Sequence, residues 1–185
     1  MPDSSQQRSL PMFLLGFLSA LVVLIAGVFL YLRFGHLPVA TADSAFPMEA
    51  QIVQVPLHAR IDRELQAAPF PVSEAVLQSG AHLYVAECAS CHGTPGHPVR
   101  FAATMFPVTP QLWQKHGHGS VVGVSDDEAG ETYWKVANGI RLSGMPAYKT
   151  LLSTEQMWQI ALLMKNADQP LTPAVQTILQ STSQH

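Results

Sequence analysis

The sequence predicts an all-α protein with one apolar membrane helix, a flexible tether and a small helical domain. Three observations lead to this prediction. Residues 12–32 carry no charged side chain, helical start and stop signals recur after residue 72, and no stretch alternates apolar with polar residues as a half-buried strand does. The 185 residues have a formal net charge of -3, so the chain lacks the basic excess that nucleic-acid binding requires.

The apolar run from Met12 to Leu32 predicts a transmembrane helix that residues 1–11 precede. At 1.5 Å per residue it would span roughly 30 Å, about one bilayer hydrocarbon core. Its uniform apolar character argues against a buried helix of a soluble protein. A signal peptide cleaved at Ala40–Ala42 is a second alternative, but that site lies well beyond the run, which is also longer than a signal h-region. We therefore expect an uncleaved anchor.

The composition of residues 33–72 predicts a tether between the anchor and the folded domain. Prolines, alanines and small polar residues dominate from Phe34 to Pro56. A short helix is expected over Leu57–Ala67, because Pro69 and Pro71 interrupt the chain directly after it.

Residues 73–169 predict the folded domain. Ser73 is a candidate N-cap for a helix that ends near Ala89, and apolar residues recur there at helical spacing. Residues 92–124 have no period and predict a loop. Residues 170–185 form a C-terminal tail, with one short helix expected over Leu171–Leu179.

Two capping-box patterns predict the other helices of the domain. Ser125–Glu128 would open a helix that stops at Gly139. Ser153–Gln156 would open the last long helix, which Pro170 closes.

The two cysteines of the chain lie in one motif, Cys88-Ala89-Ser90-Cys91-His92. This C-x-x-C-H spacing is typical of c-type heme attachment. Two thiols at a helix end can each add to one vinyl group of the same porphyrin, and the next residue then places an imidazole under the iron. The motif therefore predicts a covalent heme with His92 as an iron ligand.

Three other interpretations of the cysteines were weighed. A thioredoxin-like redox pair normally lies beside a βαβ unit, which the sequence does not show. A structural zinc site would need a fourth ligand from His97, His116 or His118, at a spacing that fits no standard finger. A disulfide between cysteines three residues apart would close a very small loop and constrain little.

Met145 is the candidate for the second iron ligand. It lies in a loop between Gly144 and Pro146, whereas most methionines fill cores from helix faces. Met105 is an alternative ligand. Bis-histidine ligation through His116 or His118 is another alternative.

Four segments resemble a membrane-anchored, mono-heme class I cytochrome c. They match the family's first helix and heme motif, its proline segment, its third helix with the methionine loop, and its C-terminal helix. The resemblance covers Val72–Ala167, and the four segments are Gly80–Gly93, Phe106–Trp113, Tyr133–Tyr148 and Glu155–Lys165.

The resemblance implies a small all-α domain around one heme c. Cys88 and Cys91 would carry the thioethers, and His92 and Met145 would be the axial ligands of the iron. These four residues are the predicted site.

The resemblance also implies two supporting contacts. The backbone carbonyl of Pro110 would accept a hydrogen bond from His92 and orient it, with Pro107 as the alternative. Gly80 on the first helix would cross Trp158 on the last.

By the same resemblance the protein is an electron-transfer protein, not an enzyme. It would pass single electrons between a membrane dehydrogenase, a quinol-oxidising complex or a terminal oxidase. In this family heme c is attached outside the bacterial plasma membrane, so residues 1–11 would be cytoplasmic and the heme domain periplasmic. A dedicated subunit of a larger membrane oxidoreductase is the alternative, followed by a heme enzyme or sensor with an open distal site.

Overall fold

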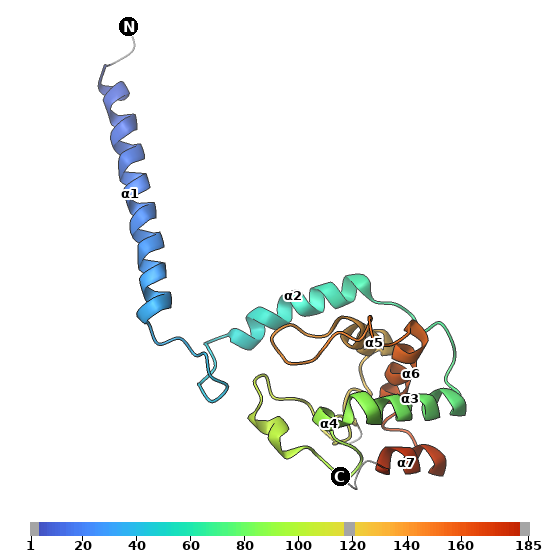
Figure 1. Cartoon of the computed structure of the whole chain (residues 1–185). Coiled ribbons are helices and arrows are strands. Elements are labelled where there is room, and N and C mark those ends of the chain that lie inside the picture. Colours follow the sequence, from blue (N-terminus) through green and yellow to red (C-terminus); the bar gives the residue numbers. More distant parts are fainter. Residues whose placement is uncertain (1–3, 117–120, 182–185) are drawn as a thin grey trace. The chain divides into compact units, whose positions relative to one another are not determined.

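The computed structural model describes residues 4–116 and 121–181, and its regular elements there are helices (Figure 1). Within these ranges the only β-type pairings are isolated bridges, so the predicted all-α class is confirmed. The chain divides into two units, Met1–Phe46 and Pro47–His185. The helices are α1 (Ser4–Phe34), α2 (Glu49–Glu64), α3 (Glu74–Glu87), α4 (Ala89–His92), the 3-10 helix η1 (Arg100–Thr104), α5 (Ala129–Asn138), α6 (Thr154–Lys165) and α7 (Pro173–Gln180).

The first unit is dominated by α1. Its part from Pro11 to Phe34 is long and apolar enough to cross a membrane, and none of that stretch is buried within the protein. A membrane anchor and a signal sequence both have this length and composition, and α1 fits either.

Helix α2 differs from the sequence prediction. A helix was expected over Leu57–Ala67, but α2 runs over Glu49–Glu64 with Pro56 inside it. Proline removes one backbone N–H, so the carbonyl of Ile52 loses its helical partner. Residues 51–56 are exposed, and water can hydrate that carbonyl in place of the lost bond. Only residues 35–48 therefore lie outside a helix between α1 and α2.

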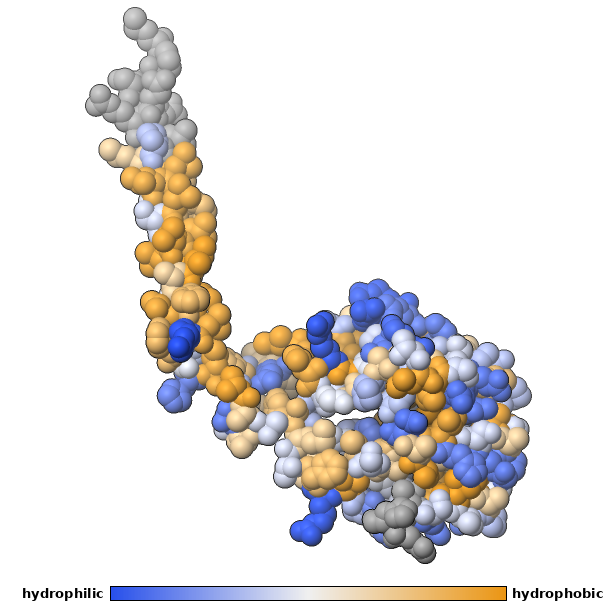
Figure 2. Space-filling model, viewed as in Figure 1, coloured by the Kyte–Doolittle hydropathy of each residue, from blue (hydrophilic) through white to orange (hydrophobic). Residues whose placement is uncertain are grey.

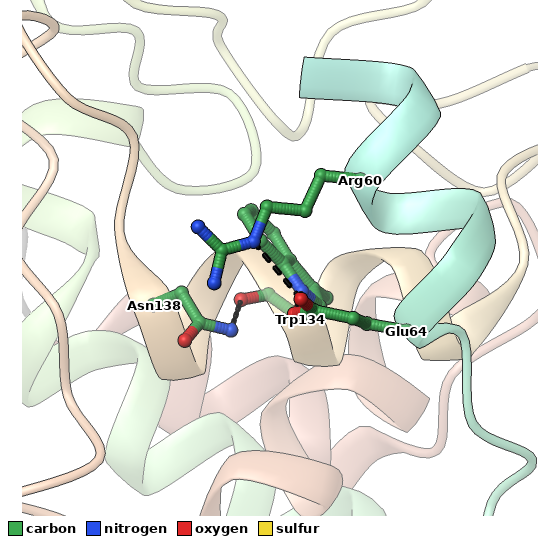
Figure 3. A network of polar contacts seen from close by, with 4 residues as sticks. All are labelled: Arg60, Glu64, Trp134 and Asn138. Carbon is green, nitrogen blue, oxygen red and sulfur yellow. Dashed lines mark hydrogen bonds and ion pairs between the residues drawn. The ribbon is translucent and has the colours of Figure 1, made fainter. Parts of the chain in front are cut away.

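The C-terminal half of α2 packs against α5 (Figure 3). Ile61 is 1% exposed. The indole Nε1 of Trp134 donates a hydrogen bond to Glu64 Oε2 at 2.7 Å, and Arg60 pairs with the other oxygen of that carboxylate at 2.9 Å. The Arg60 guanidinium also lies 5.8 Å from the centre of the Trp134 ring. These contacts make α2 part of the folded domain.

Shortening Ile61 to alanine tests whether α2 stabilises the domain. We expect Ile61→Ala to lower the free energy of unfolding by about 2–3 kcal/mol, because it removes a buried side chain and leaves a cavity. Val53→Ala is the matched control, since Val53 is 57% exposed on the same helix. Urea unfolding of the two variants gives the comparison, and equal stabilities would show that α2 is only loosely attached.

The crossing of α3 and α6 is the largest helix contact of the domain. A Cβ atom on Gly80 would lie 2.9 Å from the carbonyl carbon of Gln159 and 3.2 Å from Leu163 Cβ. Gly80 therefore meets the α6 backbone at Gln159, the residue after the predicted partner Trp158. The Trp158 ring stacks on Tyr133, with ring centres 4.3 Å apart. Without a side chain, glycine allows the backbones themselves to approach.

The caps of these helices confirm two of three predictions. Ser73 Oγ accepts a hydrogen bond from Val76 N at 3.3 Å at the start of α3, and Ser153–Gln156 forms a reciprocal capping box at the start of α6. The predicted box at Ser125–Glu128 is wrong. Ser125 Oγ accepts from Val122 N at 3.1 Å and closes a turn before the helix, and α5 follows Glu128 without a side-chain cap.

Helix α7 completes the core below α3. It begins two residues after the start of the predicted segment Leu171–Leu179, and Pro173 occupies its first turn as predicted. Val175 and Leu179 are fully buried and belong to the same cluster as Tyr84 of α3.

Candidate heme-binding site

The C-x-x-C-H motif forms one tight helical turn at the end of α3. Cys88 caps α3 and begins α4, and its carbonyl accepts hydrogen bonds from Cys91 N at 3.1 Å and His92 N at 3.0 Å. Gly93 ends the turn with φ 74°, a left-handed conformation that favours glycine. The two thiols and the imidazole are therefore held on a single turn.

The His92 imidazole is oriented by Pro110. Its Nδ1 lies 2.8 Å from the Pro110 carbonyl oxygen, and the backbone of the same loop returns a bond from Leu112 N to the His92 carbonyl at 3.1 Å. A carbonyl only accepts, so Nδ1 carries the proton and Nε2 keeps its lone pair. Burial lowers the pKa of His92, opposed by the Pro110 hydrogen bond, and so favours the neutral imidazole that an iron ligand must be.

Gln111 braces this loop, and the sequence analysis did not single it out. Its Nε2 donates to the Cys91 carbonyl at 3.1 Å, and its Oε1 accepts from Val99 N at 2.7 Å. A Cβ on Gly93 would lie 2.8 Å from that oxygen, so the glycine also makes room for Gln111. Only the position of this amide side chain, directly after Pro110, could have pointed to such a role from the sequence.

Met145 lies in a second loop, after α5. A backbone bond from Ile140 N to the Met145 carbonyl at 3.3 Å closes this loop, and Ser143 Oγ accepts from Met145 N at 3.2 Å. Gly139 and Gly144 have φ values of 66° and 79°, which permit the two sharp bends. A hollow of about 500 Å³ opens beside the loop; it is lined by Asn138, Ile140, Arg141, Leu142, Gly144 and Met145.

Tyr148 connects the methionine loop to the attachment turn. Its hydroxyl donates to the Glu87 carbonyl at 2.8 Å, next to Cys88, and its backbone N donates to Val136 at 3.0 Å. The side chain is 8% exposed and packs in the same cluster as Met145. The structure therefore brings together the cysteine turn, His92 and Pro110 directly, and links Met145 to them through Tyr148.

Removing the Tyr148 hydroxyl should weaken this link. We expect Tyr148→Phe to lower the free energy of unfolding by about 1 kcal/mol, the usual net contribution of one buried hydrogen bond. Tyr133→Phe serves as the control, because the structure shows no hydrogen bond from the Tyr133 hydroxyl to any described residue. Thermal unfolding followed by circular dichroism would reveal a larger loss for Tyr148→Phe, and equal losses would contradict the link.

The alternative ligands have other partners in the structure. Met105 Sδ accepts a hydrogen bond from Thr109 Oγ1 at 3.1 Å. His116 Nε2 bonds to the Gly123 carbonyl, and His97 Nδ1 lies 3.1 Å from the Pro95 carbonyl. His118 lies outside the described residues.

The chemistry of the site favours a covalent porphyrin over a redox-active thiol pair and over a zinc site. Burial, with smaller contributions from the charges of Glu87 and Cys91, raises the pKa of the Cys88 thiol to about 12. A redox-active pair needs a lowered thiol pKa. Among residues 4–116 and 121–181, no three His, Cys, Asp or Glu side chains are arranged to hold a metal ion by themselves. Two free thiols and one imidazole with an available Nε2 are what a covalent heme requires.

Comparison with known proteins agrees with this geometry. Residues 75–164 match the family model described as cytochrome C oxidase, cbb3-type, subunit III. A search of curated proteins finds no match. A cytochrome c domain implies a covalent heme that carries electrons, and both attachment cysteines lie within the matched residues. Residues 75–164 are therefore a cytochrome c domain of the cbb3 oxidase subunit III family, preceded in the same chain by one apolar N-terminal helix.

Proposed function

We propose that the chain is a membrane-anchored, one-electron carrier with a single heme c. In this proposal Cys88 and Cys91 form the thioethers, and His92 and Met145 are the axial ligands. The observation that carries it is the 2.8 Å contact between His92 Nδ1 and the Pro110 carbonyl, directly after the cysteine turn. This hydrogen bond leaves His92 Nε2 free to bind a metal on the same turn that carries the two thiols.

The residues of the chain divide the work of holding and tuning the cofactor. When bound, the heme supplies a reversible one-electron couple. The Pro110 carbonyl raises the basicity of His92, and the Met145 thioether favours the reduced state because it is a weak donor to ferric iron. With both ligands in place no position is left for oxygen or peroxide, so we propose electron transfer without catalysis.

We propose that α1 is an uncleaved anchor, with residues 1–11 in the cytoplasm and the domain at 73–169 in the periplasm of the bacterial plasma membrane. The anchor confines the domain near the membrane and raises its effective concentration for membrane-bound partners. Electrons would pass between a membrane dehydrogenase or quinol-oxidising complex and a terminal oxidase.

The deciding experiment is an optical spectrum of the purified chain, with acid–acetone extraction of the pigment. We expect the colour to stay with the protein and the oxidised form to show the weak far-red band of a sulfur–iron bond. A covalent heme without that band, which rapidly binds cyanide, would replace Met145 ligation with an open distal site and favour a heme enzyme or sensor. Colourless protein after expression with the heme-attachment machinery would reject the proposal.

A second candidate function is a fixed subunit of a larger oxidase, and the family match favours it. Purification from native membranes distinguishes the two. A carrier separates from its partners at moderate salt because such electron-transfer interfaces are small. A subunit stays with other polypeptides at constant stoichiometry.

A further inference from the structure

Helix α2 has apolar residues on two opposite sides. Its inner side packs on the domain through Ile61 and the Glu64–Trp134 bond. Ile52 lies two and a half turns before Ile61, which places it on the opposite side of the helix. The side of α2 that faces away from α5 is therefore apolar in its N-terminal half, where a surface helix is normally polar.

These outward residues form what we call the outer stripe: Ile52, Val55, Pro56 and Ala59, spaced at helical intervals. Ile52 is 64% exposed and Val55 is 69% exposed. Met48, directly before the helix, is 67% exposed. Figure 2 shows hydrophobic colour over the N-terminal half of α2 and hydrophilic colour over its C-terminal half. Glu49 is the only charged residue between positions 44 and 57.

The chain itself indicates what covers this stripe. Only residues 35–48 separate the end of α1 from α2. Fully extended they reach at most about 50 Å, and a turn in which Asp43 Oδ2 accepts from Val39 N and Ala40 N, both at 2.9 Å, shortens that reach. If α1 is an anchor, the N-terminal end of α2 always stays within about 50 Å of the bilayer surface.

We propose that the outer stripe of α2 lies on the lipid bilayer, with its apolar side chains at the boundary between headgroups and acyl chains. Arg63 follows on the C-terminal half, on the same side of the helix as Ile52, where it meets the headgroups. The free carbonyl opposite Pro56 keeps the helix at this hydrated depth. Because α2 is fixed to α5, docking of the stripe orients the whole heme domain relative to the membrane. This inference rests on the proposed anchor.

The test uses the full-length holoprotein in nanodiscs of phosphatidylethanolamine and phosphatidylglycerol, at one chain per disc. Ile52→Cys introduces a thiol, since the two native cysteines are consumed as thioethers. Its reaction rate with a membrane-impermeant maleimide is followed by mass spectrometry. Gln180→Cys, at an exposed position of α7, is the matched control. We expect the thiol at position 52 to react severalfold more slowly than the thiol at position 180.

A second variant separates lipid shielding from other causes. Adding Val55→Asp to Ile52→Cys should restore the fast reaction, and the exposure of Val55 means that the fold tolerates the charge. Equal rates at positions 52 and 180 with the chain in the disc would overturn the docking alone and leave the stripe to a protein partner. If the chain does not co-elute with the discs, the anchor fails and the docking fails with it.

Discussion

Replacing Met145 with histidine should lower the midpoint potential of the holoprotein by on the order of 0.1–0.3 V, a fraction of the roughly 0.8 V that axial ligands span. Histidine is a stronger donor to ferric iron than the methionine thioether, so it stabilises the oxidised state. The loop that holds Met145 is closed by its own backbone bond from Ile140 N and tolerates a side-chain change. Redox potentiometry monitored by the visible spectrum gives the value directly.

Met105→Leu is the control for this experiment. Met105 lies close to the same loop, with its Cε 3.5 Å from where a Cβ of Gly144 would be, so it tests a nearby sulfur. Its replacement should leave both the potential and the far-red band unchanged. An unchanged potential in Met145→His, or loss of the band in Met105→Leu, would transfer the ligand role from one methionine to the other.

Replacing Gly80 with valine should destabilise the domain by at least about 3 kcal/mol. The first added carbon already falls 2.9 Å from the Gln159 carbonyl carbon, and neither backbone can move aside without separating α3 from α6. The attachment turn lies at the end of α3, so the loss should also appear as a lower yield of heme-loaded protein.

Ala86→Val provides the matched comparison, because Ala86 lies on the exposed side of the same helix. It should cost less than about 1 kcal/mol, which is mainly the lower helix propensity of valine. Denaturant unfolding of both variants decides the matter: similar costs would mean that helix propensity, and not the crossing, governs position 80.

The features that the sequence predicted are those encoded locally. The turn at Cys88–His92, the capping box at Ser153–Gln156 and the stop at Gly139 each depend on residues within one or two turns of helix. Such short motifs determine the local backbone conformation without help from distant residues. The order of helices in the domain follows from them directly.

The features that the sequence did not predict depend on distant partners. Pro56 locally favours a helix start, but α2 begins before it. Helix α2 is stabilised by the burial of Ile61 and by the hydrogen bond from Trp134 to Glu64, two residues 70 positions apart in the chain. The roles of Gln111 and Tyr148 could not be predicted from neighbouring residues, because their hydrogen-bond partners are the distant backbone carbonyls of Cys91 and Glu87. Ser125 shows the converse case. Its local pattern predicts a helix cap, but its hydroxyl accepts a hydrogen bond from Val122 N in a turn before the helix.

The crossing of α3 and α6 joins the beginning of the domain to its end, which has a consequence for biogenesis. During synthesis α3 and the cysteine turn emerge well before Thr154, so the surface around Gly80 stays open until α6 has left the ribosome. Contacts between such distant segments form late in folding. A chain truncated before α6 keeps the surface around Gly80 exposed as a target for proteases.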